Sequence, residues 1–266
     1  FLWVLPLALY LLSFILCFDA PRYYVRPLFL AALPFAFYGL DRIMDEGMAV
    51  PAMIALISTS LFVFCMVCHG ELVRRKPHPR HLTLFYLMLS LGGALGGMFV
   101  GLLAPAVFIA YFELPIGLFL CALLVVVVLW QELRPLWRIL LLLALCGYGF
   151  RLGEVSKEFV DGYHVVVRNF YSQLRVSEKN GDLPGPKRVM VHGRINHGEQ
   201  YLAEEHRRTP TTYYCHESGV GRAIFALPQD RPLKLGMVGL GAGTLAAYGR
   251  AGDELRIYEI NDQVLD

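Results

Sequence analysis

The sequence changes character near residue 150, and this change limits what the chain can fold into more than any other feature. Residues 1–150 carry 9 Lys and Arg and 7 Asp and Glu, whereas residues 151–266 carry 15 of each sign. The mean hydropathy of +0.50 is too high for an ordinary soluble domain, and the charge-poor half accounts for it. We therefore expect a transmembrane helical region over 1–150, followed by a polar half.

Six apolar segments approach the length of about 20 residues that a spanning helix needs. They are residues 1–18, 27–40 with some extension, 49–68, 82–108, 116–130 and 136–150. Hardly any ionisable residue falls inside them, which argues against an ion or proton path. The segment 82–108 also repeats glycine every four residues, a spacing that predicts close packing of helices. The glycines are Gly92 and Gly96, and Gly93, Gly97 and Gly101.

The basic loop within 71–81 gives the orientation of the membrane region. It contains Arg74, Arg75, Lys76 and Arg80, which the positive-inside rule places in the cytoplasm. If every later segment spans, residue 151 onward lies outside, where a cytosolic cofactor is absent. Either segment 136–150, short for a span, then lies in the interface, or segment 82–108 bends back. The sequence leaves both alternatives open.

The ends, the net charge and the cysteines exclude several other classes. The chain starts at Phe1 inside an apolar run and stops at Asp266, so we expect a fragment cut at both ends. A net charge of +2 without a basic aromatic stripe indicates no nucleic-acid partner. Five of the six cysteines lie in apolar segments, which implies no disulfide framework. The haem-like spacing of "CMVCH" is interpreted as chance.

The polar half begins with predicted strands. "YHVVVRNFYSQLRV" partly alternates, and "KRVMVHGRINHGEQYL" indicates two short strands around Gly193 and Gly198. The apolar end of "RRTPTTYYCHESGVGRAIFAL" predicts the start of a helix. His192 and His197 are five apart, which on one strand points them to opposite faces and argues against a metal pair. We expect no metal site.

A glycine loop, "GLGAGTL", follows the apolar strand 233–238. Gly239, Gly241 and Gly243 permit unusual backbone angles and close approach of a ligand. Thr244 begins a predicted helix, whose N-terminus offers free N–H groups. Glu259 comes 16 residues after Gly243 at the end of the strand-like "ELRIYEIND", where its carboxylate can accept hydrogen bonds from ribose hydroxyls. This order of elements predicts a nucleotide-like cofactor.

Two cofactors fit the loop. Residues 241–246 satisfy a GxGxxA dinucleotide pattern, whereas the tighter Gly-x-Gly-x-Gly is similar to the S-adenosylmethionine loop. The β-rich unit in front favours the second, because it resembles the spermidine synthase (aminopropyltransferase) family. The whole chain resembles the bacterial membrane-fused spermidine synthase-like proteins through "HGEL", "FYLMLSLGGALGG", "RNFYSQLRV", "RRTPTTYY", "SGVG" and "GLGAGTLAAYG…YEIN".

This resemblance implies a fold and a division of the chain. Residues 1–150 would be the transmembrane helices and 151–230 the β-rich part of the aminopropyltransferase-like domain. Residues 231–266 would begin a Rossmann-like, class I S-adenosylmethionine-binding domain, truncated here. The implied donor is S-adenosylmethionine or its decarboxylated form, used as a co-substrate without a metal.

The resemblance also implies site residues. Gly239, Gly241, Gly243, Thr244 and Glu259 would bind the nucleoside. Cys215-His216-Glu217 is similar to the family's Tyr-His-Glu, with the tyrosine, Tyr214, displaced by one, so Tyr214 and His216 would bind the substrate. Two positions depart from the pattern. Ala242 stands where soluble members have an acid for the amine, and His192 stands where they have aspartate. The catalytic aspartate would lie beyond Asp266, and the sequence identifies no catalytic residue.

The sequence thus predicts an enzyme of the bacterial inner membrane with a cytoplasmic aminopropyltransferase-like domain. It would act on a small-molecule amine. Because Ala242 replaces the acid that would meet the amine, putrescine is predicted to be a poor acceptor. One alternative is a methyltransferase of the same fold. Another is a membrane transporter or sensor whose nucleoside-binding domain does not catalyse a reaction.

Overall fold

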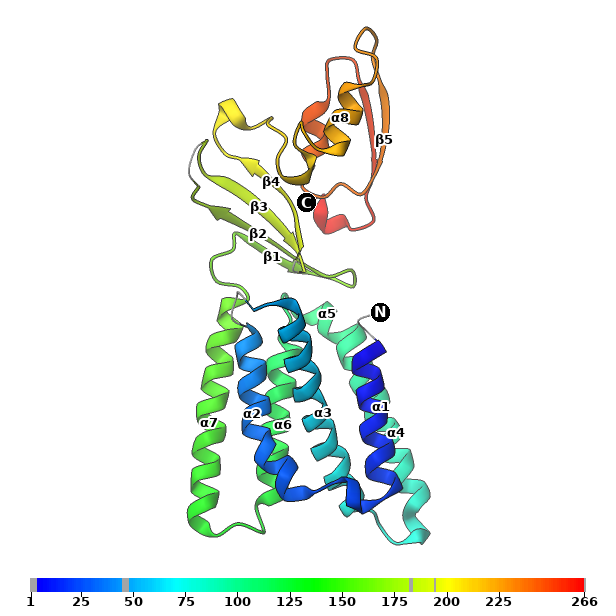
Figure 1. Cartoon of the computed structure of the whole chain (residues 1–266), viewed down its shortest axis with the longest axis vertical. Coiled ribbons are helices and arrows are strands. Elements are labelled where there is room, and N and C mark those ends of the chain that lie inside the picture. Colours follow the sequence, from blue (N-terminus) through cyan, green and yellow to red (C-terminus); the bar gives the residue numbers. More distant parts are fainter. Residues whose placement is uncertain (1–3, 45–47, 182–183, 194, 266) are drawn as a thin grey trace. The chain divides into compact units, whose positions relative to one another are not determined.

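The computed structural model describes residues 4–44, 48–181, 184–193 and 195–265. The chain forms two compact units, one of Phe1–Gly96 with Leu114–Val155 and one of Gly97–Glu113 with Ser156–Asp266. The helices labelled in the lower part of Figure 1 are α1 (Val4–Asp19), α2 (Arg26–Met44), α3 (Val50–Arg74), α4 (Leu82–Met98), α5 (Ala104–Val107), α6 (Glu113–Leu129) and α7 (Pro135–Glu158).

Three helices are long and apolar enough to cross a membrane, as expected of a membrane protein. They are Val50–Arg74, Pro79–Val107 and Pro135–Glu158, while Val4–Asp19 and Glu113–Leu129 are apolar but shorter. Of the two alternatives that would change the direction of the chain, the bend within segment 82–108 is wrong, and the interfacial position of segment 136–150 stays a prediction. The segment that begins near 136 is a helix of 24 residues, long enough to span, and Pro79–Val107 continues through a π-helical turn at Phe99–Leu103 without reversing.

Helix α3 forms the centre of the helical unit. Its side chains Val63, Phe64, Met66 and Val67 are buried against residues of α1, α2, α6 and α7. The glycine repeat of α4 does not share in this packing, because a Cβ added at Gly92, Gly93, Gly96, Gly97 or Gly101 would meet nothing within 4 Å. The close helix packing predicted from these glycines is therefore not found among the described residues.

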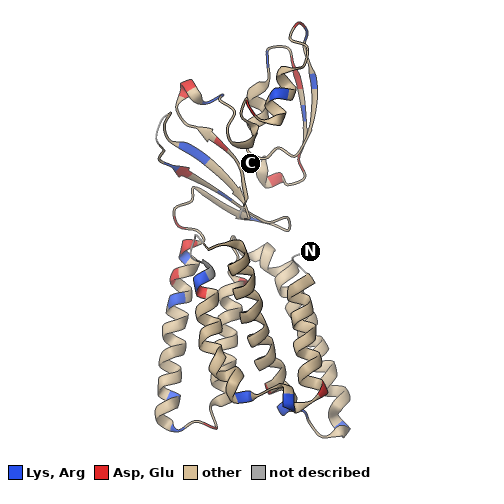
Figure 2. Ribbon diagram, viewed as in Figure 1, with Lys and Arg blue, Asp and Glu red and all other residues tan. Residues whose placement is uncertain are grey.

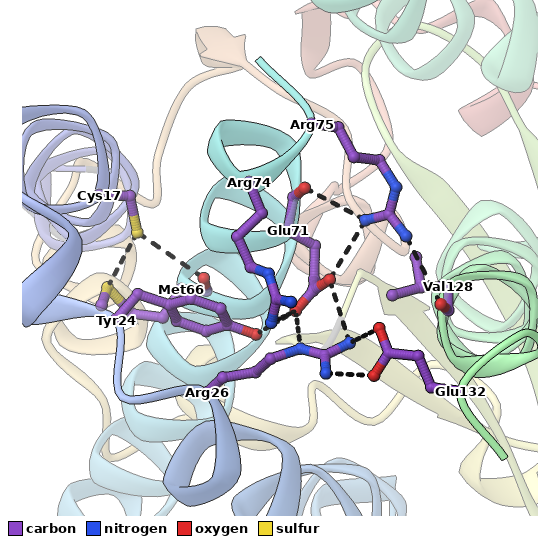
Figure 3. A network of polar contacts seen from close by, with 9 residues as sticks. All are labelled: Cys17, Tyr24, Arg26, Met66, Glu71, Arg74, Arg75, Val128 and Glu132. Carbon is purple, nitrogen blue, oxygen red and sulfur yellow. Dashed lines mark hydrogen bonds and ion pairs between the residues drawn. The ribbon is translucent and has the colours of Figure 1, made fainter. Parts of the chain in front are cut away.

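A polar network closes one end of the helical unit (Figure 3). Glu71 lies near the end of α3, and its side chain is only 6% exposed. Its carboxylate accepts hydrogen bonds from the Tyr24 hydroxyl at 3.0 Å, Arg26 Nε at 2.6 Å and Arg75 Nη1 at 3.1 Å. Arg26 also donates to Glu132 after α6 at 2.9 Å, so the network joins α2, α3 and the end of α6.

Charge is distributed unequally between the two ends of the helical unit. The end formed by the loops 20–25, 75–81 and 130–134 carries Arg22, Arg26, Arg74, Arg75, Lys76, Arg80, Arg134 and Arg138. In Figure 2 the long middle parts of the helices carry almost no charged residues. After the basic loop the chain forms the Pro79–Val107 helix, α6 and α7 in turn, so α7 ends at the opposite end of this unit.

The second unit contains the strands expected from the alternating pattern. β1 (Val165–Arg168), β2 (Gln173–Lys179), β3 (Lys187–His192) and β4 (Ile195–Tyr201) form an antiparallel sheet in chain order. The sheet buries Leu174 and Val189, and the β3–β4 register shifts between Met190 and Val191. The predicted helix is present as α8 (Gly219–Phe225), where the Ser218 hydroxyl accepts from the N–H of Gly221 at 3.1 Å.

The last part of this unit is a parallel pair of strands. β5 (Lys234–Val238) pairs with β6 (Glu254–Tyr258), and Val238 lies opposite Tyr258. The glycine loop follows β5, but the predicted helix after it is only a 3-10 helix, Thr244–Tyr248. With left-handed glycines at 239, 241 and 243 and so short a helix after them, few backbone N–H groups form a regular array that could face a ligand. Two parallel strands do not by themselves form a Rossmann-like sheet, and that assignment stays a prediction.

Candidate nucleoside site

The glycine loop needs its three glycines for backbone reasons. Gly239, Gly241 and Gly243 have φ angles of +87°, +57° and +71°, a region that L-residues with a Cβ rarely adopt. The loop begins where Gly239 N donates to Tyr258 O at 2.7 Å, and it turns where Gly243 N donates to Leu240 O at 3.0 Å. The sequence spacing therefore reflects three left-handed positions in five residues.

Glu259 lies beside this loop, as the sequence predicts, but its hydrogen bonds were not foreseen. Its Oε2 accepts from the backbone N–H of Leu240 at 2.8 Å. Its Oε1 accepts from those of Ile260 and Asn261 at 2.8 and 2.9 Å. These backbone donors hold the pKa of Glu259 below its usual value, so the group is anionic at neutral pH. A carboxylate accepts about four hydrogen bonds, which leaves roughly one position for a ligand hydroxyl.

Strand β4 packs directly against the glycine loop. Ala242 N donates to His197 O at 3.4 Å, and Gly198 lies next to it with φ +144°. A Cβ at Gly198 would come within 2.6 Å of the Ala242 Cβ and 3.0 Å of Thr244 Oγ1. Gly198 is thus required for close approach of sheet and loop.

The interpretation that His192 and His197 point to opposite faces is wrong. The two rings lie with centroids 5.4 Å apart. They belong to different strands, β3 and β4, and the chain reverses between them at Gly193, which has φ +64°. Burial lowers the pKa of His192, and the neighbouring His197 lowers it further. Across the described parts of the chain, no group of three or more His, Cys, Asp or Glu could hold a metal ion.

Tyr214 and His216 do not join the glycine loop and Glu259. The His216 ring packs against Phe225 and Tyr248 at centroid distances of 5.2 and 5.7 Å. It lines a cavity of about 220 Å³ together with Arg250 and Asp253. The backbone carbonyl of Tyr214 accepts from the Tyr248 hydroxyl at 2.6 Å. Thr244, in contrast, lines a cavity of about 340 Å³ beside the glycine loop.

A pair of asparagines connects the loop acid to the antiparallel sheet. Asn169 follows β1 and donates through Nδ2 to Asn261 Oδ1 at 2.6 Å. Asn261 is only 2% exposed, and its N–H is one of the donors to Glu259. Gln263 Nε2 also donates to Arg168 O at 3.4 Å. Sequence reasoning missed this connection, because no local pattern pairs residues 92 positions apart.

Comparison with known proteins adds no further assignment: no family model matches the chain, and no match is found among curated proteins or solved structures.

Proposed function

We propose that the polar half binds an S-adenosyl nucleoside and belongs to a transferase resembling spermidine synthase. The observation that carries this proposal is the position of Glu259 against the N–H of Leu240, in a left-handed glycine loop between two parallel strands. Ligands of open α/β sheets bind outside the carboxyl ends of the strands, and both the loop and Glu259 follow such ends. The proposal therefore takes the pair β5–β6 as the start of a Rossmann-like domain.

The proposed reaction transfers an aminopropyl group. The nitrogen of an acceptor amine attacks the methylene carbon beside the sulfonium, forming a C–N bond. The C–S bond breaks, its electron pair stays on sulfur, and a thioether nucleoside leaves. The amine loses one proton to a base. Holding donor and acceptor in line supplies most of the acceleration in such a step.

The direct test of this function is product analysis with the full-length protein. We expect decarboxylated S-adenosylmethionine and an amine to give methylthioadenosine and an aminopropylated amine. Transfer of a methyl group from S-adenosylmethionine instead would identify a methyltransferase. Nucleoside binding without any product, for all amines tried, would favour a non-catalytic sensor or transporter and would contradict the enzyme proposal.

The first prediction concerns Glu259. The full-length protein is expected to bind methylthioadenosine more tightly than NAD. Glu259→Ala should weaken that binding by about 1.5–3 kcal/mol, because hydrogen bonds to a charged group are lost. The structure adds a second cause, since the N–H groups of Leu240, Ile260 and Asn261 lose their acceptor. Isothermal titration calorimetry measures both affinities.

Glu254→Ala is the matched control, because Glu254 begins β6 and its side chain is 51% exposed. Its affinity for the nucleoside should equal that of the unaltered protein. An unchanged affinity in Glu259→Ala would remove Glu259 from the site, and tighter binding of NAD would overturn the nucleoside assignment.

We propose a bacterial inner-membrane location with the polar half in the cytoplasm, where the nucleoside donor is made. Three apolar helices separate the basic loop from the polar half, namely Pro79–Val107, α6 and α7. If each crosses once, a cytoplasmic polar half requires the basic loop to lie outside, against the positive-inside tendency. This conflict makes the orientation a decisive test of the proposed function.

A further inference from the structure

The cavity beside the glycine loop has a volume of about 340 Å³, large enough for a small organic molecule. Ala242, Gly243 and Thr244 of the loop line one side. Glu199 and Gln200 of β4 and the segment from Arg207 to Thr209 line the other. The cavity thus adjoins the proposed nucleoside site without including Glu259.

The charges on the cavity wall are predominantly positive. Arg208 forms no ion pair within the described parts of the chain. Among the described residues, Arg207 pairs only with Glu204, at 3.3 Å; the Glu204 side chain is 87% exposed, and an exposed pair of this kind neutralises little. Both guanidinium groups are exposed enough to turn toward a bound anion.

The one acid in the wall is already neutralised. Glu199 is 16% exposed and accepts from Lys187 Nζ at 2.6 Å and from Asn196 Nδ2 at 2.9 Å. Its charge is therefore balanced by Lys187 on the neighbouring strand β3. Ala242, which also lines the cavity, adds no charge.

A buried hydroxyl also lines the cavity. Thr244 is 9% exposed, and its Oγ1 has no hydrogen-bond partner in the described structure. An unpaired buried hydroxyl is costly, and a ligand that accepts a hydrogen bond from it removes the cost. A phosphate or carboxylate oxygen can accept from this hydroxyl, but an ammonium group can also donate to its oxygen, so the preference for an anion rests on Arg207 and Arg208.

We infer that this cavity binds the anionic group of a ligand, a phosphate or a carboxylate, through Arg207, Arg208 and Thr244. If the proposed transferase function holds, on which this step rests, the acceptor is an amine that also carries a phosphate or carboxylate. A diamine such as putrescine would instead bring a second ammonium group to two arginines, and like charges at such a site are repulsive.

Calorimetry on the full-length protein, at constant ionic strength, tests the inference with three probes: inorganic phosphate, glutamate and putrescine. We expect phosphate or glutamate to bind, and which of them binds identifies the anion. Arg207→Gln/Arg208→Gln should weaken that binding at least tenfold, because charge-assisted hydrogen bonds are lost. Arg256→Gln on β6 is the matched control, since its side chain is 67% exposed outside the cavity, and it should bind as before.

Methylthioadenosine affinity, measured on the same samples, separates the two proposals. An unchanged nucleoside affinity in the double variant shows that the polar half is folded. If the nucleoside binds but neither anion does, or if putrescine binds more tightly than both, the inference is wrong and the proposed function stands. If an anion binds through the two arginines but the nucleoside does not, the cavity assignment stands and the transferase proposal fails.

Discussion

Replacing Glu113 by alanine is expected to lower the free energy of opening of the β1–β2 pair by about 3–5 kcal/mol. Arg168, at the end of β1, is 5% exposed and forms an ion pair with Glu113, which is 12% exposed, at 2.5 Å. Its guanidinium also donates to Ala110 O at 2.7 Å and lies 4.3 Å from the centre of the Tyr111 ring. Without Glu113, the arginine remains buried without its carboxylate, which is the costly case for a buried pair.

Hydrogen exchange read by mass spectrometry on the full-length protein measures this opening free energy directly. The double variant Glu113→Ala/Arg168→Met is the control, because replacing both partners by apolar side chains removes the unpaired charge. It should recover most of the loss, while amides of α3 should exchange equally in all samples. A change below about 0.5 kcal/mol in the single variant would show that the pair does not hold β1.

The same substitution is expected to affect the nucleoside site. Asn169 directly follows Arg168 and bonds to Asn261, whose N–H donates to Glu259. Opening of the β1–β2 pair therefore frees Asn169, which through Asn261 holds Glu259 in place. Glu113→Ala should therefore weaken the affinity for methylthioadenosine. The loss should be smaller than in Glu259→Ala, because Glu259 itself is retained.

Local order in the polar half could be predicted from the sequence. The alternating apolar residues predicted the strands β1 to β4, and the apolar run before Gly239 predicted β5. The neighbourhood of Glu259 and the loop follows from chain geometry, since parallel strands bring their carboxyl ends together. The three N–H donors to Glu259 could not be read in this way, because the Leu240 N–H is placed by the left-handed angles of the loop, and the N–H groups of Ile260 and Asn261 by the backbone after β6.

The errors have physical causes in particular residues. The segment that begins at 136 looked short because the apolar run stops at Phe150, yet α7 continues to Glu158. Arg151, the residue after Phe150, forms an ion pair with Asp41 of α2 at 3.1 Å, and hydropathy does not reveal this partner. The spacing of His192 and His197 was judged as if both lay on one strand, although a break was predicted at Gly193, where the chain reverses between β3 and β4. Pairs such as Glu113 and Arg168, 55 residues apart, leave no local signal.

Cysteine labelling is expected to place the polar half and the basic loop on opposite sides of the membrane. Asn180, exposed directly after β2, and His78, exposed in the basic loop, are separated by three apolar helices. If α6, which has 17 residues and is the shortest of the three, crosses the bilayer as the other two can, an odd number of crossings separates the two sites. Under the proposed function, Asn180→Cys should resist a membrane-impermeant maleimide in intact cells, and His78→Cys should react.

The unaltered protein sets the background in this experiment, because its six cysteines are retained in both variants. Permeabilised cells should label Asn180→Cys fully, which shows that the site itself is reactive. Labelling of both sites from the same side would mean that one of the three helices does not cross. Labelling of Asn180→Cys alone in intact cells would mean that the arginines of the basic end set the orientation. The polar half would then face away from the cytosolic nucleoside pool, and a transferase that uses this pool would be excluded.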